Sequence, residues 1–338
     1  MKSVILLGDV RQRLSEIPEG SVRTCITSPP YFGLRDYGTA SWEDGDSECS
    51  HTISMDTKWN DPKRGTSVLR PEVSGRGGNA DFCHLCGATR IDSQLGLEAT
   101  PDAYVAEMVS VFREVWRVLA DDGTLWLNIG DSYGKEKQLI GIPWRVAFAL
   151  QADGWYLRSD IIWAKPNPMP ESVRDRPTKS HEYVFLLSKS PKYYYDHEAI
   201  KEPAACAEPT SVSYRKNGKS DKRKNSQTNV GGKPGFGEGM WQPAETRNKR
   251  DVWTINTKPY KGAHFAVMPE ALVEPCVLAG SAEGDTVLDP FTGSGTVAVV
   301  ANRHGRNFVG TELNPEYSEI AKARIKDDSP MFNEVEVI

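Results

Sequence analysis

Two short segments of this 338-residue chain carry residue types suited to chemistry on a polar ring and a nucleoside. The first begins where a run of strand composition, Val22–Thr27, meets two prolines, which cannot continue the hydrogen-bond ladder of a strand. A rigid loop then presents the Ser28 hydroxyl, the Pro29 carbonyl and the Tyr31 ring. The hydroxyl and the carbonyl can hydrogen-bond an exocyclic amine, and the ring can stack on a base. Alone, the same residues would equally make a plain turn with Tyr31 in the core.

The second segment is a glycine-containing turn, Asp289 to Thr296, which follows a short apolar strand at residues 285–288. Parallel sheets bind ligands beyond the carboxyl ends of their strands, and Gly293 and Gly295 permit close approach of a ligand to the backbone. Glu312 ends the next strand, at a distance that suits a carboxylate on ribose hydroxyls. A third glycine and a Gly-Lys-Ser/Thr sequence are missing, so the turn favours a nucleoside without pyrophosphate over NAD or ATP. The alternative is an ordinary tight turn.

Two close pairs of cysteine and histidine have the spacing of a metal site. Cys49-x-His51 is followed later by Cys83-x-x-Cys86, and a glycine comes directly after the second pair. Four such ligands match structural Zn²⁺, with His84 outside the set. The surrounding segment has little apolar material, so a metal would give it a reason to be ordered. The alternative is a group of unrelated free thiols, since a disulfide framework is unexpected in a chain this long without a signal peptide.

The elements that must position these residues alternate between helix and strand. Apolar residues at helical spacing predict a helix over 101–119, and a second helix is expected over 139–152. Strands are predicted at 22–27, 124–129, 161–163 and 183–187. Near the carboxyl end, a strand, a glycine turn, a helix (297–302) and a strand (307–313) form a βαβ unit. This pattern predicts an α/β fold with a mostly parallel sheet covered on both faces. Residues 41–95 and 203–250 are polar and are interpreted as insertions.

Composition excludes several classes of protein. With 38% hydrophobic and 26% charged residues, the chain is neither disordered nor fibrous, and no apolar run approaches the roughly 20 residues that span a bilayer. We therefore expect a cytoplasmic protein. The net charge of −5 argues against general coating of nucleic acid. However, residues 211–261 hold twelve Lys/Arg against four Asp/Glu, which favours a localised polyanion contact over the alternative of a solvated loop.

Together the two motifs resemble those of the β-class amino-methyltransferases of DNA, which methylate cytosine N4 or adenine N6 with S-adenosylmethionine. The catalytic tetrapeptide of that family, Ser/Asp/Asn-Pro-Pro-aromatic, is matched by Ser28, Pro29, Pro30 and Tyr31. The cofactor motif, Asp-Pro-Phe-x-Gly-Ser-Gly-Thr, is matched by Asp289 to Thr296, and the two occur in the β-class order. The resemblance covers most of residues 1–40 and 97–325. It implies a Rossmann-like, circularly permuted fold with zinc-knuckle and DNA-recognition segments inserted.

The resemblance also assigns parts of the chain. Residues 1–40 and 97–200 would form the catalytic part, 41–96 the zinc-binding insertion, 201–256 the basic target-recognition region and 257–338 the cofactor-binding part. The implied cofactor-binding residues are Asp9, Thr27, His264, Phe265, Ala266, Pro269, Asp289, Pro290, Phe291, Thr292, Gly293, Ser294, Gly295, Thr296, Glu312, Leu313 and Asn314. The expected DNA contacts are Lys216, Lys219, Lys222, Arg223, Lys224, Arg247, Lys249 and Arg250. Candidates of second rank on the target-base side are Asn167, Pro168 and Met169, with residues 172–176.

In this family the catalytic loop makes the amine nucleophilic and needs no covalent enzyme intermediate. Cys276 is therefore interpreted as a core residue, although it follows a proline as the nucleophile of carbon-5 cytosine methyltransferases does. Serine at position 28 is the pattern usual for cytosine N4 enzymes, and aspartate is usual for adenine N6. The sequence thus favours cytosine N4 in double-stranded DNA. It leaves open adenine N6, a methyltransferase of RNA or of a small amine, and a catalytically silent DNA-binding regulator. A cognate restriction endonuclease and a homodimer also stay open as partners.

Overall fold

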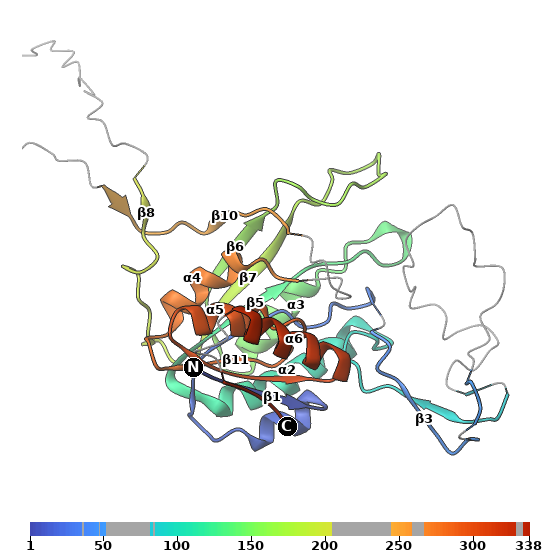
Figure 1. Cartoon of the computed structure of the whole chain (residues 1–338). Helices are drawn as coiled ribbons and strands as arrows, with labels where there is room; N and C mark the ends of the chain where they lie inside the picture. The colour runs from blue at the N-terminus through green and yellow to red at the C-terminus, as the bar shows by residue number, and fades with distance from the viewer. Residues whose placement is uncertain are drawn as a thin grey trace, which may run out of the picture.

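The computed structural model describes residues 1–35, 37–46, 48–51, 82–83, 85–204, 245–258, 267–328 and 334–338 (Figure 1). Within these residues the main sheet has nine strands in the order β10-β6-β7-β5-β2-β11-β12-β1-β13. Its strands are β1 (Lys2–Leu7), β2 (Val22–Thr27), β5 (Leu119–Ile129), β6 (Tyr156–Ala164), β7 (His181–Ser188), β10 (Val252–Thr254), β11 (Thr286–Asp289), β12 (Asn307–Glu312) and β13 (Glu334–Val337). Of these nine strands only β7 is antiparallel to its neighbours, so the expected mostly parallel sheet is confirmed.

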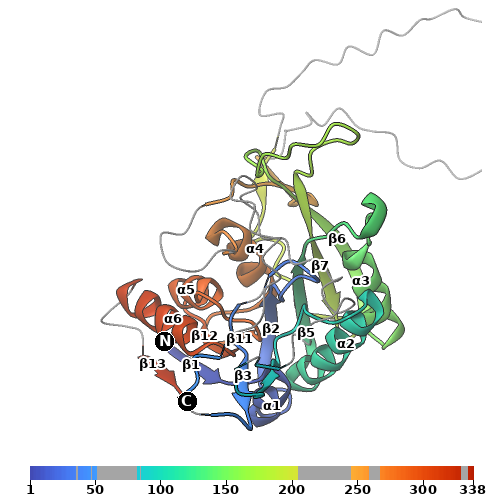
Figure 2. The same ribbon diagram turned by 90° about the vertical axis from the view of Figure 1, so that its right-hand side faces the viewer.

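Helices cover both faces of this sheet (Figure 2). They are α1 (Val10–Arg13), α2 (Pro101–Val118), α3 (Ile142–Ala152), α4 (Glu270–Gly280), α5 (Thr296–Arg303) and α6 (Pro315–Asp328). Alternate side chains of one strand enter opposite cores: Cys25 of β2 packs with α1, α2 and α3, whereas Ile26 packs with α4, α5 and α6. This alternation explains why the central strands carry apolar residues on both faces. Cys276 lies in the second core at 2% exposure, as expected for a structural cysteine.

The helix and strand boundaries follow local sequence signals. Helix α2 begins after Thr100, whose hydroxyl accepts a hydrogen bond from the Ala103 amide at 3.1 Å. It ends one residue before the predicted boundary. The strand predicted at 124–129 begins earlier, at Leu119. The prediction treated residues 121–123 as a break, but the ladder accommodates them as an irregularity, because Val22 pairs with Leu119 and Thr24 with Thr124.

The topology brings the two sequence motifs to one edge of the sheet. Strand β2 pairs in parallel with β11 on one side and with β5 on the other, so the carboxyl ends of all three strands lie together. The predicted catalytic loop (Ser28–Tyr31), here called the catalytic loop, follows β2, and the glycine turn (Asp289–Thr296) follows β11. Since β7 runs antiparallel to β5, the amino end of β7 reaches the same edge. This edge is therefore where a ligand crevice is expected.

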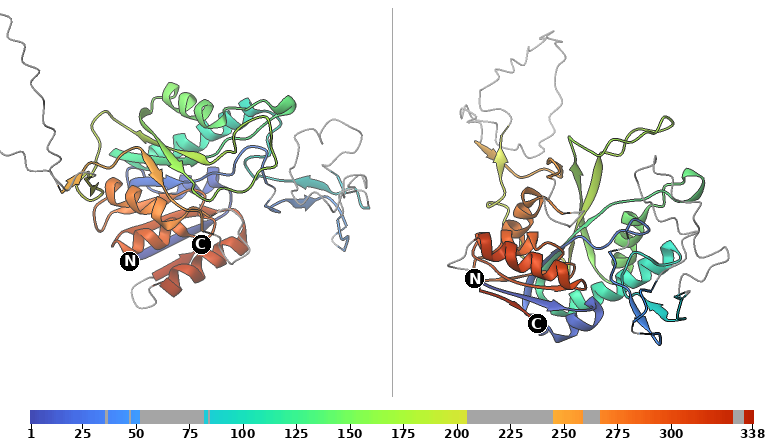
Figure 3. Two further views of the ribbon diagram at one scale, coloured as in Figure 1. Left: turned by 90° about the horizontal axis from the view of Figure 1, so that it is seen from above. Right: turned by 45° about the vertical axis from the view of Figure 1, so that its right-hand side comes forward.

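The two insertions leave the body on opposite sides (Figures 1 and 3). One, here called the arm (the described residues within 37–51 and 82–95), carries the antiparallel pair β3 (Ser41–Glu43) and β4 (Thr89–Ile91). At the root of the other, β8 (Glu202–Pro203) pairs with β9 (Thr246–Arg247). Among the described helices none is long and apolar enough to cross a membrane.

Candidate active site

A cavity of about 1010 Å³ lies at the edge where β2, β5 and β11 end. It takes its walls from both ends of the chain and from the base of the arm. Of the predicted catalytic and cofactor-binding residues, those that line it are Asp9, Ser28, Pro29, Pro30, Tyr31, Asp289, Pro290, Phe291, Thr292, Gly293, Ser294, Thr296, Glu312, Leu313 and Asn314. The catalytic loop and the glycine turn, 258 residues or more apart in the chain, thus share one cavity.

A buried hydrogen bond joins the two motifs. The Thr27 hydroxyl at the end of β2 donates to Asp289 Oδ1 at the end of β11, at 2.7 Å, and the Phe291 amide donates to the same oxygen at 3.0 Å. Asp289 is 2% exposed, and this burial raises the pKa of its carboxyl to about 7. Thr27 itself is buried and does not line the cavity. These two residues fix the position of one motif relative to the other.

Glu312 anchors the glycine turn from the neighbouring strand β12. One carboxylate oxygen accepts a hydrogen bond from the Gly293 amide at 2.7 Å, and the other accepts from the Asn314 amide at 2.9 Å. Burial raises the pKa of this carboxyl above its usual range. Glu312 lines the cavity together with Leu313 and Phe291. A carboxylate set between apolar walls fits the ribose and base of a nucleoside.

Gly295 permits close packing against a helix and does not contact the ligand cavity. It adopts a left-handed conformation (φ +74°), and an added Cβ would lie 3.0 Å from Cβ of Ala321 in α6. It does not line the cavity, and neither does Pro269, which precedes the first turn of α4. Asp9 lines the rim, but its carboxylate caps α1 and pairs with Arg11 at 2.6 Å. His264, Phe265 and Ala266 lie outside the described residues.

A polar network fixes the catalytic loop on the other side of the cavity. The Tyr31 hydroxyl donates to Glu182 Oε2 at 2.8 Å and lies 3.4 Å from Ser28 Oγ. Asn128, at the end of β5, donates from its side-chain amide to Ser28 Oγ at 3.2 Å and to the Tyr31 hydroxyl at 3.0 Å. Lys165, which directly follows β6, pairs with the other oxygen of Glu182. Burial and the Glu182 charge hold the pKa of Tyr31 well above its usual value.

The loop backbone is also held from below. The Tyr104 hydroxyl of α2 donates to the Pro30 carbonyl at 2.9 Å. Gly130 lets the Tyr31 ring pack closely, because an added Cβ would come within 2.6 Å of that ring. The loop is thus preorganised, with the Ser28 hydroxyl facing a cavity and oriented by its neighbours.

Sequence reasoning did not identify Asn128, Lys165 or Glu182. Asn128 carried a weak signal, since it is a polar residue near the end of a predicted buried strand. Glu182 directly precedes the predicted strand 183–187, but its meeting with Tyr31 depends on β7 running antiparallel to β5. That direction has no local sequence signature.

Only some of the second-rank candidates for the target-base side line the cavity. Asn167, Pro168 and Met169 line the cavity, and Asn167 is held by the Thr257 backbone amide, which donates to Asn167 Oδ1 at 2.9 Å. Residues 172–176 do not line it. Within that stretch, Arg176 pairs with Glu171 and stacks over a tyrosine ring.

The expected DNA contacts are described only in part. Arg247 and Arg250 both pair with Glu202, at 2.9 and 2.8 Å, and Lys249 lies over the Trp253 ring at 5.1 Å. These cations are thus already engaged at the root of the second insertion. The other expected contacts, Lys216, Lys219, Lys222, Arg223 and Lys224, lie outside the described residues.

Comparison with known proteins agrees with this arrangement. The family model described as DNA methylase, for N6 and N4 methyltransferases, matches residues 22–323. The chain belongs to this family of DNA methylases. Among its relatives, the Type II methyltransferase M.Cfr9I of Citrobacter freundii is 40% identical, over 95% of this chain and 87% of that protein. Members of the family take their methyl group from S-adenosylmethionine, so the methylase acts on DNA with this methyl donor.

Two solved structures share the fold of the methylase. A putative DNA modification methylase of Thermus thermophilus, in complex with S-adenosyl-L-methionine, aligns with a TM-score of 0.54 and 22% identity over 100% of both chains. The PvuII DNA methyltransferase, described as cytosine-N4-specific, aligns with a TM-score of 0.58 and 17% identity, over 99% of this chain and 94% of that one. The expected Rossmann-like methyltransferase fold is confirmed.

Proposed function

We propose that the methylase transfers the methyl group to the N4 amine of cytosine within a specific double-stranded DNA sequence. The observation that carries this proposal is a neutral hydroxyl, Ser28, at the head of a rigid loop that faces the cavity. Serine at this position is the usual pattern in the cytosine N4 members of the family that the sequence resembles. The target base would leave the duplex and enter the cavity between the catalytic loop and residues 167–169.

In this proposal Ser28 Oγ and the Pro29 carbonyl accept the two hydrogens of the amine. An amine conjugated with its ring is a poor nucleophile, and two acceptors placed out of the ring plane favour a nitrogen whose lone pair can attack. When bound at the glycine turn, S-adenosylmethionine supplies an electrophilic methyl group. The protein contributes mainly position, because Asn128 and Tyr104 hold the loop before the base arrives.

The amine must also lose a proton, and Glu182 is the proposed acceptor. As the amine forms its new bond to carbon, one N–H bond breaks and its proton goes to Ser28 Oγ. Ser28 passes its own proton to the Tyr31 oxygen, and Tyr31 passes its proton to Glu182 Oε2. The charge balances, since the cationic amine becomes neutral and the carboxylate becomes a carboxylic acid. The 3.4 Å step between Ser28 and Tyr31 is long for two hydroxyls and must shorten in the reacting complex.

The names of the relatives support a proposal for the biological role. M.Cfr9I is named a Type II methyltransferase, and we infer that the methylase likewise protects DNA beside a cognate restriction endonuclease. The silent-regulator alternative is disfavoured, because every group of the catalytic loop and of the glycine turn is intact, and most of these residues line one cavity. Methylation of adenine N6 is the competing outcome, and experiment must distinguish it from methylation of cytosine N4.

The proposed role of Ser28 predicts a large fall in activity for Ser28→Ala. Removing one hydrogen-bond acceptor that acts in the transition state costs about 10²–10³ in rate. Labelled methyl transfer from S-adenosylmethionine to double-stranded DNA measures this rate, and calorimetry should show cofactor affinity within about twofold of wild type, since Ser28 lies on the target side. Ser21→Ala, an exposed serine whose hydroxyl donates to the Pro18 carbonyl, is the matched control. Wild-type activity in Ser28→Ala would contradict the assignment.

A further inference from the structure

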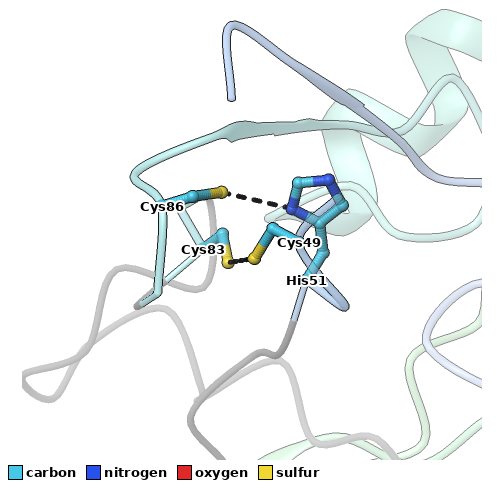
Figure 4. A group of neighbouring side chains, drawn as sticks. All are labelled: Cys49, His51, Cys83 and Cys86. Carbon is cyan, nitrogen blue, oxygen red and sulfur yellow. Dashed lines mark hydrogen bonds between the residues drawn. The ribbon is translucent and has the colours of Figure 1, made fainter. Parts of the chain in front are cut away.

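The arm gathers four side chains that the methyl transfer does not use. Cys49 and His51 come from one leg of the arm and Cys83 and Cys86 from the other, and their donor atoms all lie within 4.8 Å of one another (Figure 4). The set contains the four residues that the sequence predicted as ligands. It lies apart from the cavity, since none of the four lines it.

The spacing of these atoms matches a tetrahedral metal site. The Cys49 and Cys83 sulfurs are 3.8 Å apart, and Cys86 Sγ lies 3.3 Å from His51 Nδ1. With metal–sulfur bonds of about 2.3 Å, two ligands of a tetrahedral zinc ion are separated by about 3.8 Å. A disulfide would bring two sulfurs to about 2.05 Å, so Cys49 and Cys83 are not oxidised to each other.

The arm around the cluster is built to hold these ligands. Between Cys83 and Gly87 the chain turns tightly: the Gly87 amide donates to the Cys83 carbonyl at 2.8 Å, and Gly87 has φ +75°. The His51 ring is stacked on Trp42 of β3, with centroids 5.1 Å apart, and this contact sets its orientation. Gly45 lets the two legs meet, because an added Cβ would lie 2.9 Å from Cys86 Sγ.

We propose that Cys49, His51, Cys83 and Cys86 bind one structural Zn²⁺ ion. Three thiolates and one imidazole are a soft donor set that suits zinc rather than magnesium or calcium. Four protein ligands complete a tetrahedron and leave no position for water or substrate, so the ion stabilises the arm and takes no part in catalysis. The apolar side chains beside the ligands do little to stabilise the arm, because Phe82 and Leu85 are exposed at 43% and 66%. A metal ion would supply that stability.

The proposed zinc also supports one wall of the active-site cavity. At the base of the arm the Tyr37 amide donates to Gln94 Oε1 at 2.7 Å, and the Gln94 side-chain amide donates to the Arg35 carbonyl at 2.8 Å. All three residues line the cavity. The metal therefore joins the two legs at one end of the arm while these bonds join them at the other.

Metal analysis of the full-length methylase tests the proposal. Protein purified without chelator should contain about one zinc per chain, and Cys49→Ser and Cys83→Ser should each lose most of it. Replacement by Co²⁺ should give the thiolate-to-cobalt absorption bands and the intense visible bands of a tetrahedral site. His84→Ala, a histidine between two ligands that the sequence leaves outside the set, is the matched control and should keep its zinc.

Failure of a variant to fold is separated from failure to bind metal by the Co²⁺ spectrum of wild type, which needs no substitution. The proposal is overturned if metal-replete wild-type protein holds less than about a tenth of an equivalent of zinc and gives no thiolate–cobalt bands. It is also overturned if Cys83→Ser retains full zinc, or if His84→Ala loses zinc while His51→Ala retains it. None of these results depends on methyl-transfer activity.

Discussion

At the scale of single residues, the proposed chemistry depends on a series of hydrogen bonds that orient the Ser28 hydroxyl. Ser28 contacts Asn128 and Tyr31, and Tyr31 in turn contacts Glu182, whose other oxygen is held by Lys165. Each group is oriented by the next, so the Ser28 hydroxyl, which we propose contacts the target amine, is in place before the base arrives. The proposed proton route uses the same contacts in sequence.

Glu182→Gln tests that route directly. Glutamine can still accept the Tyr31 hydrogen bond but cannot take a proton, so the single-turnover rate should fall by about 10²–10³. Affinities for S-adenosylmethionine and DNA should stay within about twofold. Glu19→Gln, an exposed glutamate, is the control.

Rescue by formate distinguishes proton transfer to Glu182 from a purely structural role of this residue. In Glu182→Ala, added formate should restore part of the rate, because a small carboxylate can occupy the vacated space and accept the proton. If formate has no effect and Glu182→Gln is as active as wild type, Glu182 is not the acceptor.

At the scale of elements, the link between β2 and β11 carries a pH dependence. The raised pKa of Asp289, about 7, means that the folded protein holds this proton more tightly than the unfolded chain does. Ionisation as the pH rises from about 4 to about 7 therefore costs stability. Asn in place of Asp keeps the acceptor for Thr27 and Phe291 and carries no charge.

Asp289→Asn should consequently become more stable relative to wild type as the pH increases. In the cofactor-free protein, the difference in the free energy of unfolding between the variant and wild type should grow by about 2–3 kcal/mol from about pH 5 to about pH 8. Denaturant unfolding of both proteins at the two pH values measures it. A difference that is constant with pH, or one that shrinks, would contradict the buried-carboxyl account.

The elements also show how far sequence reasoning reaches. Strand β2 was predicted at its observed bounds, and α2 and α5 within about a residue, because apolar periodicity, the prolines and the glycines are local signals. The start of β5 was predicted five residues late, since the ladder absorbs residues 121–123. Most cavity residues of the two motifs were predicted from the resemblance. Glu182 and Lys165 were not, because strand direction and register depend on tertiary pairing.

At the scale of the whole molecule, two polar insertions flank an α/β body that holds the cavity (Figure 3). Acidic residues outnumber basic ones in the chain as a whole. Residues 211–261, most of which belong to the second insertion, instead have an excess of basic residues. We expect this insertion to contact DNA phosphates, and phosphate contacts make binding depend on salt.

Replacing Lys222, Arg223 and Lys224 together by alanine should weaken DNA binding. The slope of log affinity against log salt concentration should become shallower by about one for each phosphate that the variant no longer neutralises, while cofactor affinity stays unchanged. Fluorescence anisotropy over a salt series measures the slope. Alanine at Lys2, Lys192 and Lys326, three exposed lysines of the body, removes the same charge as a control. Equal slopes for the two triple variants would place the DNA contact elsewhere.

The central claim is the identity of the methylated atom. The most direct measurement is mass spectrometry of nucleosides from double-stranded DNA incubated with the wild-type methylase and S-adenosylmethionine, with a reaction that lacks S-adenosylmethionine as the blank. The proposal predicts N4-methylcytosine, formed by wild type and formed about 10²–10³-fold more slowly by Ser28→Ala. N6-methyladenine in its place would contradict the cytosine assignment and show that the serine at position 28 does not select the base.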